Sequence, residues 1–148
     1  MYRSRLVLLV SLLSLVLSLS ACKSGPSDPA SYRSAMKGLT PAMTKLAMTT
    51  RDASTAGDPM QLSSALQKTL ASAKSVHALC KKLEVSEASL AGLHADLLAA
   101  TASHVAALEE AAGGAKSTPI PETKGLMNDS NEELLEAVQA WNDGLDAL

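Results

Sequence analysis

Residues 59–83 read PMQLSSALQKTLASAKSVHALCKKL, a stretch with a strongly periodic pattern. Small and apolar residues recur there at alternating spacings of four and three, so they fall on one face of an α-helix. Asp58 offers an N-cap, and Pro59 suits the first helical position because the N–H that proline lacks would go unpaired there. We therefore predict a helix from Pro59 whose buried face carries Leu62, Leu66, Thr69, Ala73, Val76, Cys80 and Leu83.

The same spacing recurs in three other segments, which span residues 32–53, 90–111 and 134–148. The links near 55–57 and 84–86 are short, and short links favour antiparallel neighbours. The link from 113 to 129 is long and contains two prolines, so we expect it to form a loop or to cross the bundle. Abundant Ala and sparse β-formers also favour helices. We predict an all-α fold, a four-helix antiparallel up-down bundle.

Gly38 and Pro41 interrupt the first of these segments. Proline inside a helix removes a hydrogen bond and costs about 3 kcal/mol. Thr40 can cap a new helix with Pro41 at its first position, yet the apolar stripe passes through the interruption in register. We therefore expect one helix that is kinked near Gly38–Pro41.

The N-terminal residues have the pattern of an export signal. Two arginines lie within the first five residues and precede a run of Leu, Val and Ser at 6–19, which is too short and too rich in serine for a transmembrane helix. The sequence LSAC at 19–22 then resembles the lipobox of bacterial lipoproteins. The resemblance implies cleavage after Ala21 and a diacylglycerol on the Cys22 thiol. The alternative is an ordinary secretory signal cut at the same bond, which leaves Cys22 free.

This resemblance divides the chain into a signal peptide at 1–21, a lipidated tether at 22–27 and a helical domain at 28–148. It implies attachment to a membrane of the cell envelope, because each methylene buried in the bilayer contributes about 0.8 kcal/mol and two or more acyl chains anchor a protein stably. Lys23, rather than an aspartate, follows the cysteine. In lipoproteins of this class that residue favours the outer membrane over the inner one.

Composition limits the partners and the chemistry. Without residues 1–21 the chain has 11 basic and 15 acidic residues, which does not suggest a nucleic-acid-binding protein. Cys80 is the only cysteine besides Cys22, so an acylated Cys22 leaves no intramolecular disulfide. The sequence contains no nucleophile elbow, no complete phosphate-binding loop and no covalent haem motif. We therefore expect no enzymatic activity and no cofactor other than the covalent lipid.

Polar and sulfur-containing residues on the apolar faces suggest an alternative, a metal or haem site inside the bundle. Imidazole, thiolate and thioether groups suit soft metals and haem iron. Cysteine and methionine are also ordinary core residues, and two histidines ten positions apart on a helix lie about 80° apart around it. The candidate ligands are His77, Cys80, His94, His104, Met36 and Met43.

The leading interpretation is a non-enzymatic, membrane-anchored module that binds another protein or an envelope component, or that has a structural role there. The candidate surface is the long 113–129 link. Ile120, Leu126 and Met127 are apolar residues in a segment that we expect to be exposed near the fourth helix. We therefore predict that these three residues contact the partner.

Overall fold

The computed structural model describes residues 25–148. Cys22, the predicted signal peptide and the predicted cleavage site lie outside the described residues. The helices are α2 (Pro29–Ala35), the 3-10 turn η2 (Met36–Gly38), α3 (Leu39–Thr55), α4 (Pro59–Lys81), α5 (Ala88–Gly114) and α6 (Ile120–Asp146). Within 25–148 there is no strand, and no helix has the length and apolar character needed to cross a membrane.

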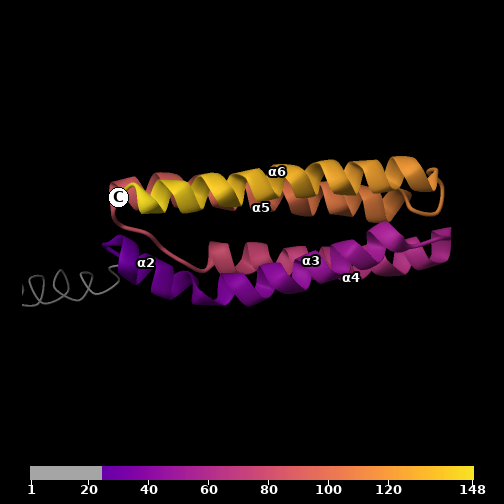
Figure 1. Ribbon diagram of the computed structural model, residues 1–148. Helices are drawn as coiled ribbons and strands as arrows, with labels where there is room; N and C mark the ends of the chain where they lie inside the picture. Colours follow the sequence, from indigo (N-terminus) through magenta and orange to yellow (C-terminus); the bar gives the residue numbers. More distant parts are fainter. Residues whose placement is uncertain (1–24) are drawn as a thin grey trace, which may run out of the picture.

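The helices form an elongated bundle of two layers, with α2, α3 and α4 in one layer and α5 and α6 in the other (Figure 1). Along the chain, α3 packs on α4, α4 on α5, and α5 on α6, and each helix reverses the direction of the one before it. In contrast, α3 and α6 touch at only a few points. The predicted all-α four-helix bundle is confirmed, and one of its four sides is left open.

Aspartate caps begin the first two helical segments, as predicted. Asp58 accepts hydrogen bonds at 2.9 Å from the backbone N–H groups of Met60 and Gln61, and Asp28 accepts one at 2.9 Å from that of Ser31. These bonds satisfy amide groups that have no partner inside a helix. Local sequence therefore fixes where these helices begin.

The first helix is bent where the sequence predicts a kink. Regular α-helix stops at Ala35, one 3-10 turn follows at Met36–Gly38, and α-helix resumes at Leu39. Pro41 thus lies in the first turn of α3, where a missing backbone N–H removes no helical hydrogen bond. Tyr32 before the bend and Leu46 after it are both buried, so both parts of the segment pack on the core.

The predicted long link from 113 to 129 is wrong in extent, because α6 begins at Ile120. Pro121 lies in its first turn, where proline is tolerated. The buried face of α6 begins with Thr123, Met127 and Ser130, at spacings of four and three. Two of these three side chains are polar, so the helical pattern of this region is weak in the sequence.

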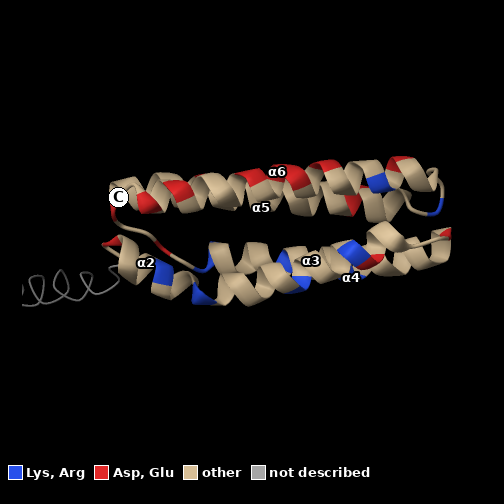
Figure 2. Cartoon of the chain, viewed as in Figure 1, with Lys and Arg blue, Asp and Glu red and all other residues tan. Residues whose placement is uncertain are grey.

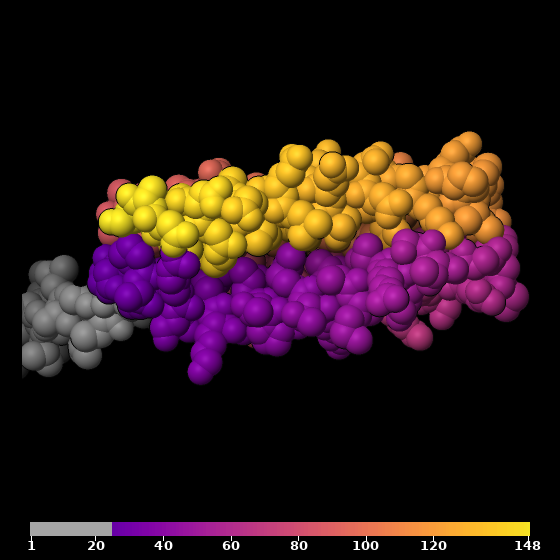
Figure 3. All heavy atoms as spheres, in the orientation of Figure 1, coloured from indigo at the N-terminus to yellow at the C-terminus, as the bar shows by residue number. Residues whose placement is uncertain are grey.

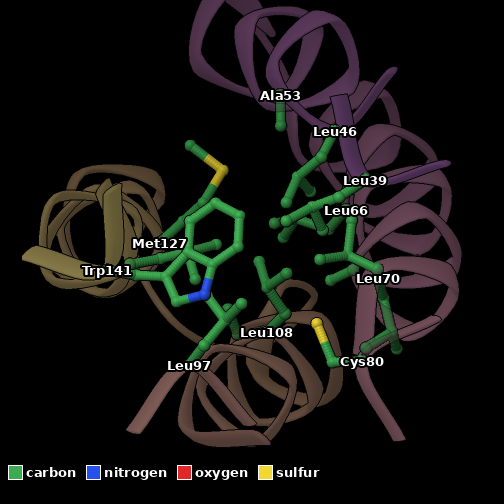
Figure 4. Packing of buried hydrophobic residues seen from close by; sticks show 14 of the residues in the cluster. Leu39, Leu46, Ala53, Leu66, Leu70, Cys80, Leu97, Leu108, Met127 and Trp141 are labelled. Atoms are coloured by element: carbon green, nitrogen blue, oxygen red, sulfur yellow. The ribbon is translucent and has the colours of Figure 1, made fainter. Parts of the chain in front are cut away.

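The core is built mainly from leucines and is closed by two aromatic residues at one end. Tyr32 of α2 is fully buried, and Trp141 of α6 is 9 % exposed. Figure 4 shows side chains of α3, α4, α5 and α6, among them Leu66, Leu108 and Trp141, pointing toward a common interior. At about 25 cal/mol per Å² of buried apolar surface, this shared core is the main stabilising contribution to the fold.

Charge is divided between the two layers. Between residues 28 and 83 there are eight Lys and Arg but three Asp and Glu, whereas between 84 and 148 there are two and twelve. The formal balance is therefore +5 for the part that contains α2, α3 and α4, and −10 for the part that contains α5 and α6. Figure 2 shows this separation, with basic residues on one layer and acidic residues on the other. A salt bridge of 2.7 Å between Lys74 of α4 and Glu109 of α5 links the two layers.

Candidate functional site

The open side of the bundle contains a groove between α3 and α6. It has a volume of about 760 Å³ and lies along the seam between the two helices that faces the viewer in Figure 3. Binding pockets for small molecules typically measure about 300–1,000 Å³ and are mostly apolar with a few polar groups. The groove therefore has the size of a binding site for a small ligand.

Two contacts set the register of α3 against α6. At the end near the 3-10 turn, Arg33 forms an ion pair with Asp146. At the opposite end, the Lys124 ammonium group donates hydrogen bonds of 2.7 Å to the backbone carbonyls of Ser54 and Ala56. We call these the Arg33 end and the Lys124 end. Because the helices are antiparallel, residues whose numbers sum to about 178 face one another across the groove.

The middle of the groove and the part toward the Arg33 end contain all of its apolar lining residues. Polar and charged residues line the same part: Arg33, Lys37, Thr40, Thr44 and Asn142. On the α3 side, the apolar lining residues are Met36, Leu39, Met43, Leu46 and Ala47. On the α6 side, they are Leu135, Val138 and Trp141. Leu135 is 53 % exposed, so part of this lining is open to water rather than packed. An apolar ligand that covered it would remove that surface from water, which is favourable.

The part toward the Lys124 end is polar. Its lining residues on α3 are Thr50, Arg51 and Ser54, and those on α6 are Asn128 and Asn131. Thr50 is 7 % exposed, and its hydroxyl oxygen has no hydrogen-bond partner among the described residues. A buried polar atom without a hydrogen-bond partner lowers the free energy of unfolding by about 1–3 kcal/mol. The presence of such an atom in a residue that lines the groove suggests a role in binding.

The groove lining is basic. Its charged residues within the described part of the chain are Arg33, Lys37 and Arg51, and no Asp or Glu lines it. The acidic residues of α6 therefore lie outside the groove, while uncharged asparagines face into it. The sequence alone did not reveal this site, because it depends on the gap between α3 and α6. The adjacent residues Thr50 and Arg51 are a local signal, but a threonine next to an arginine does not by itself indicate a binding site.

The predicted metal ligand His94 belongs instead to a buried polar cluster at the Arg33 end. Trp141 donates a hydrogen bond of 3.1 Å from Nε1 to the Tyr32 hydroxyl, which lies 2.9 Å from His94 Nδ1. With its oxygen accepting from Trp141, the hydroxyl can donate its proton to Nδ1. Burial lowers the pKa of His94, and the backbone carbonyls of Cys80 and Leu83 partly offset that shift. The cluster holds α2, α5 and α6 together.

The other two histidines also make hydrogen bonds to hydroxyl groups. His77 Nδ1 lies 3.0 Å from Thr101 Oγ1, and His104 Nδ1 lies 3.1 Å from Ser130 Oγ. The Ser130 hydroxyl donates to the backbone carbonyl of Met127 at 3.0 Å, so it accepts from His104. His104 Nε2 is then unprotonated, and it has no partner among the described residues. Burial lowers the pKa of His104, which keeps the ring neutral.

The candidate metal ligands are not brought together. Within residues 25–148, no group of three or more His, Cys, Asp or Glu side chains is arranged to hold a metal ion. Met36 and Met43 line the groove, whereas each histidine ring is bonded to a different hydroxyl group. Burial raises the pKa of the Cys80 thiol to about 11, so the thiolate that binds soft metals is disfavoured.

The expected exposure of Ile120, Leu126 and Met127 is wrong. All three lie in α6, where Met127 is fully buried and the other two are partly buried against the core. The cause is the early start of α6, which turns the expected loop into a helix with one face in the interior. The apolar surface that is accessible on this side of the molecule is the groove between α3 and α6.

No protein-family model, curated protein sequence or solved structure matches this chain.

Proposed function

We propose that the protein is a lipid-anchored, non-enzymatic binding module of the cell envelope, and that it binds its ligand in the groove between α3 and α6. The lipobox-like sequence at 19–22 supports the anchor, and Lys23 favours the outer membrane. The single observation that carries the binding role is the groove itself. It measures about 760 Å³, contains an apolar stretch, and is lined toward the Lys124 end by Thr50, whose buried hydroxyl group has no hydrogen-bond partner among the described residues.

The architecture supports binding rather than a purely structural role. A four-helix bundle can close all four of its sides by packing, and this one closes three of them. The lining of the fourth side includes leucine, methionine, valine and tryptophan side chains. Concave sites that are mostly apolar and contain a few polar groups are where proteins commonly bind ligands, and this groove has that character.

Binding can be tested with a neutral fluorescent probe, N-phenyl-1-naphthylamine, which brightens in apolar surroundings. The domain of residues 25–148 is suitable because it contains all four helices and the described core; circular dichroism and cooperative unfolding verify that it is folded. Energy transfer from Trp141, the single tryptophan and a lining residue, reports that the probe lies in the groove.

A blocking variant and a matched control make this test specific. Ala47 is exposed and lines the groove, so Ala47→Phe fills part of the groove without disturbing the core and leaves Trp141 as the single tryptophan. Ala71 is exposed on α4 and does not line the groove, so Ala71→Phe adds the same side chain elsewhere. We expect Ala47→Phe to lose most probe binding and Ala71→Phe to keep it. Equal binding by both variants would contradict the assignment of the groove.

The anchor is tested on the full chain. In a bacterial host fed radiolabelled palmitate, the wild-type protein is expected to be labelled and to sediment with membranes. Cys22→Ser is expected to lose the label, because the acceptor thiol is absent. Density-gradient separation of inner and outer membranes then tests the preference suggested by Lys23. An unlabelled wild-type protein would refute the anchor without bearing on the groove.

A further inference from the structure

We propose that the ligand of this groove is a long-chain fatty acid, held with its carboxylate beside Arg51 and Thr50 and its acyl chain along the apolar lining toward Trp141. This inference rests on the proposed binding role of the groove and adds the chemical class and the orientation of the ligand. It depends on three features of the site: its charge, the position of its unpartnered hydroxyl group, and its size.

The charge of the lining favours an anionic ligand. Although the whole chain has more acidic than basic residues, the charged residues that line the groove in the described part of the chain are all basic. Arg33 is already paired with Asp146. Within residues 25–148, Lys37 and Arg51 form no ion pair. A ligand with one negative charge would therefore find a cation at either end of the apolar stretch.

The unpartnered hydroxyl group selects one of the two ends. Thr50, whose hydroxyl oxygen is buried and without a partner in the described part of the chain, precedes Arg51, and both residues line the groove. A guanidinium group binds a carboxylate with two parallel hydrogen bonds, and rotation of the Thr50 side chain would turn its buried hydroxyl group toward the same carboxylate as a third donor. Asn128 and Asn131 lie opposite and add amide donors. The structure therefore places the carboxylate at the Lys124 end of the groove.

The length of the apolar lining matches one acyl chain. The apolar lining runs on the α3 side from Met36 to Ala47, about 16 Å at 1.5 Å per residue. The acyl chains of one membrane leaflet span about 15 Å, half of a hydrocarbon core about 30 Å thick. One acyl chain thus matches the length of the apolar part.

The test is displacement of N-phenyl-1-naphthylamine from the delipidated domain by palmitate, kept below its micelle concentration, and by hexadecanol. The two have the same chain length and differ in the charge of the head group. We expect palmitate to displace the probe at a concentration about tenfold lower than hexadecanol. We expect Arg51→Gln to remove that difference, and Lys37→Gln, the matched control at the other end of the groove, to retain it.

Each result separates the fatty-acid inference from the binding role itself. If the probe binds but palmitate and hexadecanol displace it equally, the fatty-acid assignment is wrong and the binding role stands. If Lys37→Gln removes the preference and Arg51→Gln does not, the proposed orientation is overturned. Tighter displacement by lysophosphatidylglycerol with the same acyl chain than by palmitate would assign the site to a phospholipid head group instead. If the probe does not bind to the wild-type domain, the binding role itself fails.

Discussion

Thr50→Val should make the unliganded domain more stable, although most substitutions in a protein interior destabilise it. Thr50 is 7 % exposed, and its hydroxyl oxygen lacks a partner among the described residues. Valine has nearly the same shape and a similar helix propensity, so the substitution removes the buried polar atom and changes little else. An unsatisfied buried hydroxyl group costs about 1–3 kcal/mol. We expect the free energy of unfolding to rise by about 1 kcal/mol.

The assay is thermal and urea unfolding, followed by circular dichroism. For a domain of this size, a gain of about 1 kcal/mol corresponds to a rise in Tm of roughly 3–5 °C. Thr69→Val is the matched control, because Thr69 is fully buried and its hydroxyl group donates a hydrogen bond of 3.0 Å to the carbonyl of Ala65. That substitution removes a satisfied group and should leave the stability unchanged or lower it by about 1 kcal/mol.

A Thr50→Val protein that is no more stable than the wild type would refute the reasoning. It would show that the hydroxyl group is satisfied in the unliganded protein, and the argument for a head-group site at Thr50 would then fail. If Thr50→Val is more stable than the wild type and also binds palmitate more weakly, Thr50 has a role in binding. Substitution of a residue that only packs in the core would not produce both effects. Such opposite effects are expected where a binding site retains a group at the expense of stability.

Three further substitutions test the interior. Burial lowers the pKa values of His94 and His104 below the ordinary value of 6.5, so the unfolded chain binds more protons than the folded one around that pH. The free energy of unfolding should be level only about one pH unit or more above 6.5, and it should fall as the pH is lowered through 6.5 toward 5. Urea titrations at several pH values measure this fall, which we expect to be smaller in His104→Gln. Tyr32→Phe should lower the free energy of unfolding by about 1–3 kcal/mol, because the Trp141 N–H then loses its acceptor; an unchanged urea midpoint, read from tryptophan fluorescence, would mean that the cluster is not structural. Met127→Ala should cost about 2–5 kcal/mol by the same assay, whereas a residue on an exposed partner surface would leave the midpoint unchanged.

The parts of the fold that follow from short-range rules could be predicted. The starts at Asp58-Pro59 and Asp28-Pro29 depend on bonds between an aspartate and amide groups two or three residues away, so the sequence contains both partners. The kink at Met36–Gly38 follows from the nearby glycine and proline in the same way. The periodic stripe of α4 identifies its buried face because each of its members has the same environment.

The remaining features depend on contacts between distant parts of the chain. Ser130 looks like a helix cap in isolation, but it is buried and bonded to His104, 26 residues earlier. That pairing explains why a polar residue occurs on the inner face of α6. The groove is harder still to foresee, because it arises from the absence of close packing between α3 and α6. No local sequence pattern indicates which two helices of a bundle are not closely packed.

The division of charge between the two layers makes the bundle an electric dipole directed across its long axis. At physiological ionic strength the field of a charged surface decays over about 8 Å, and packed helices lie about 8–10 Å apart. A negatively charged surface therefore attracts the layer of α2, α3 and α4 when that layer is nearest, while salt screens the acidic layer behind it. Without residues 1–21 the chain has 11 basic and 15 acidic residues, and this formal charge of −4 predicts repulsion from such a surface; the layer that faces the surface nevertheless determines whether the protein is attracted or repelled. At 1 M salt the screening length falls to about 3 Å, so the electrostatic preference for one orientation at the surface is lost.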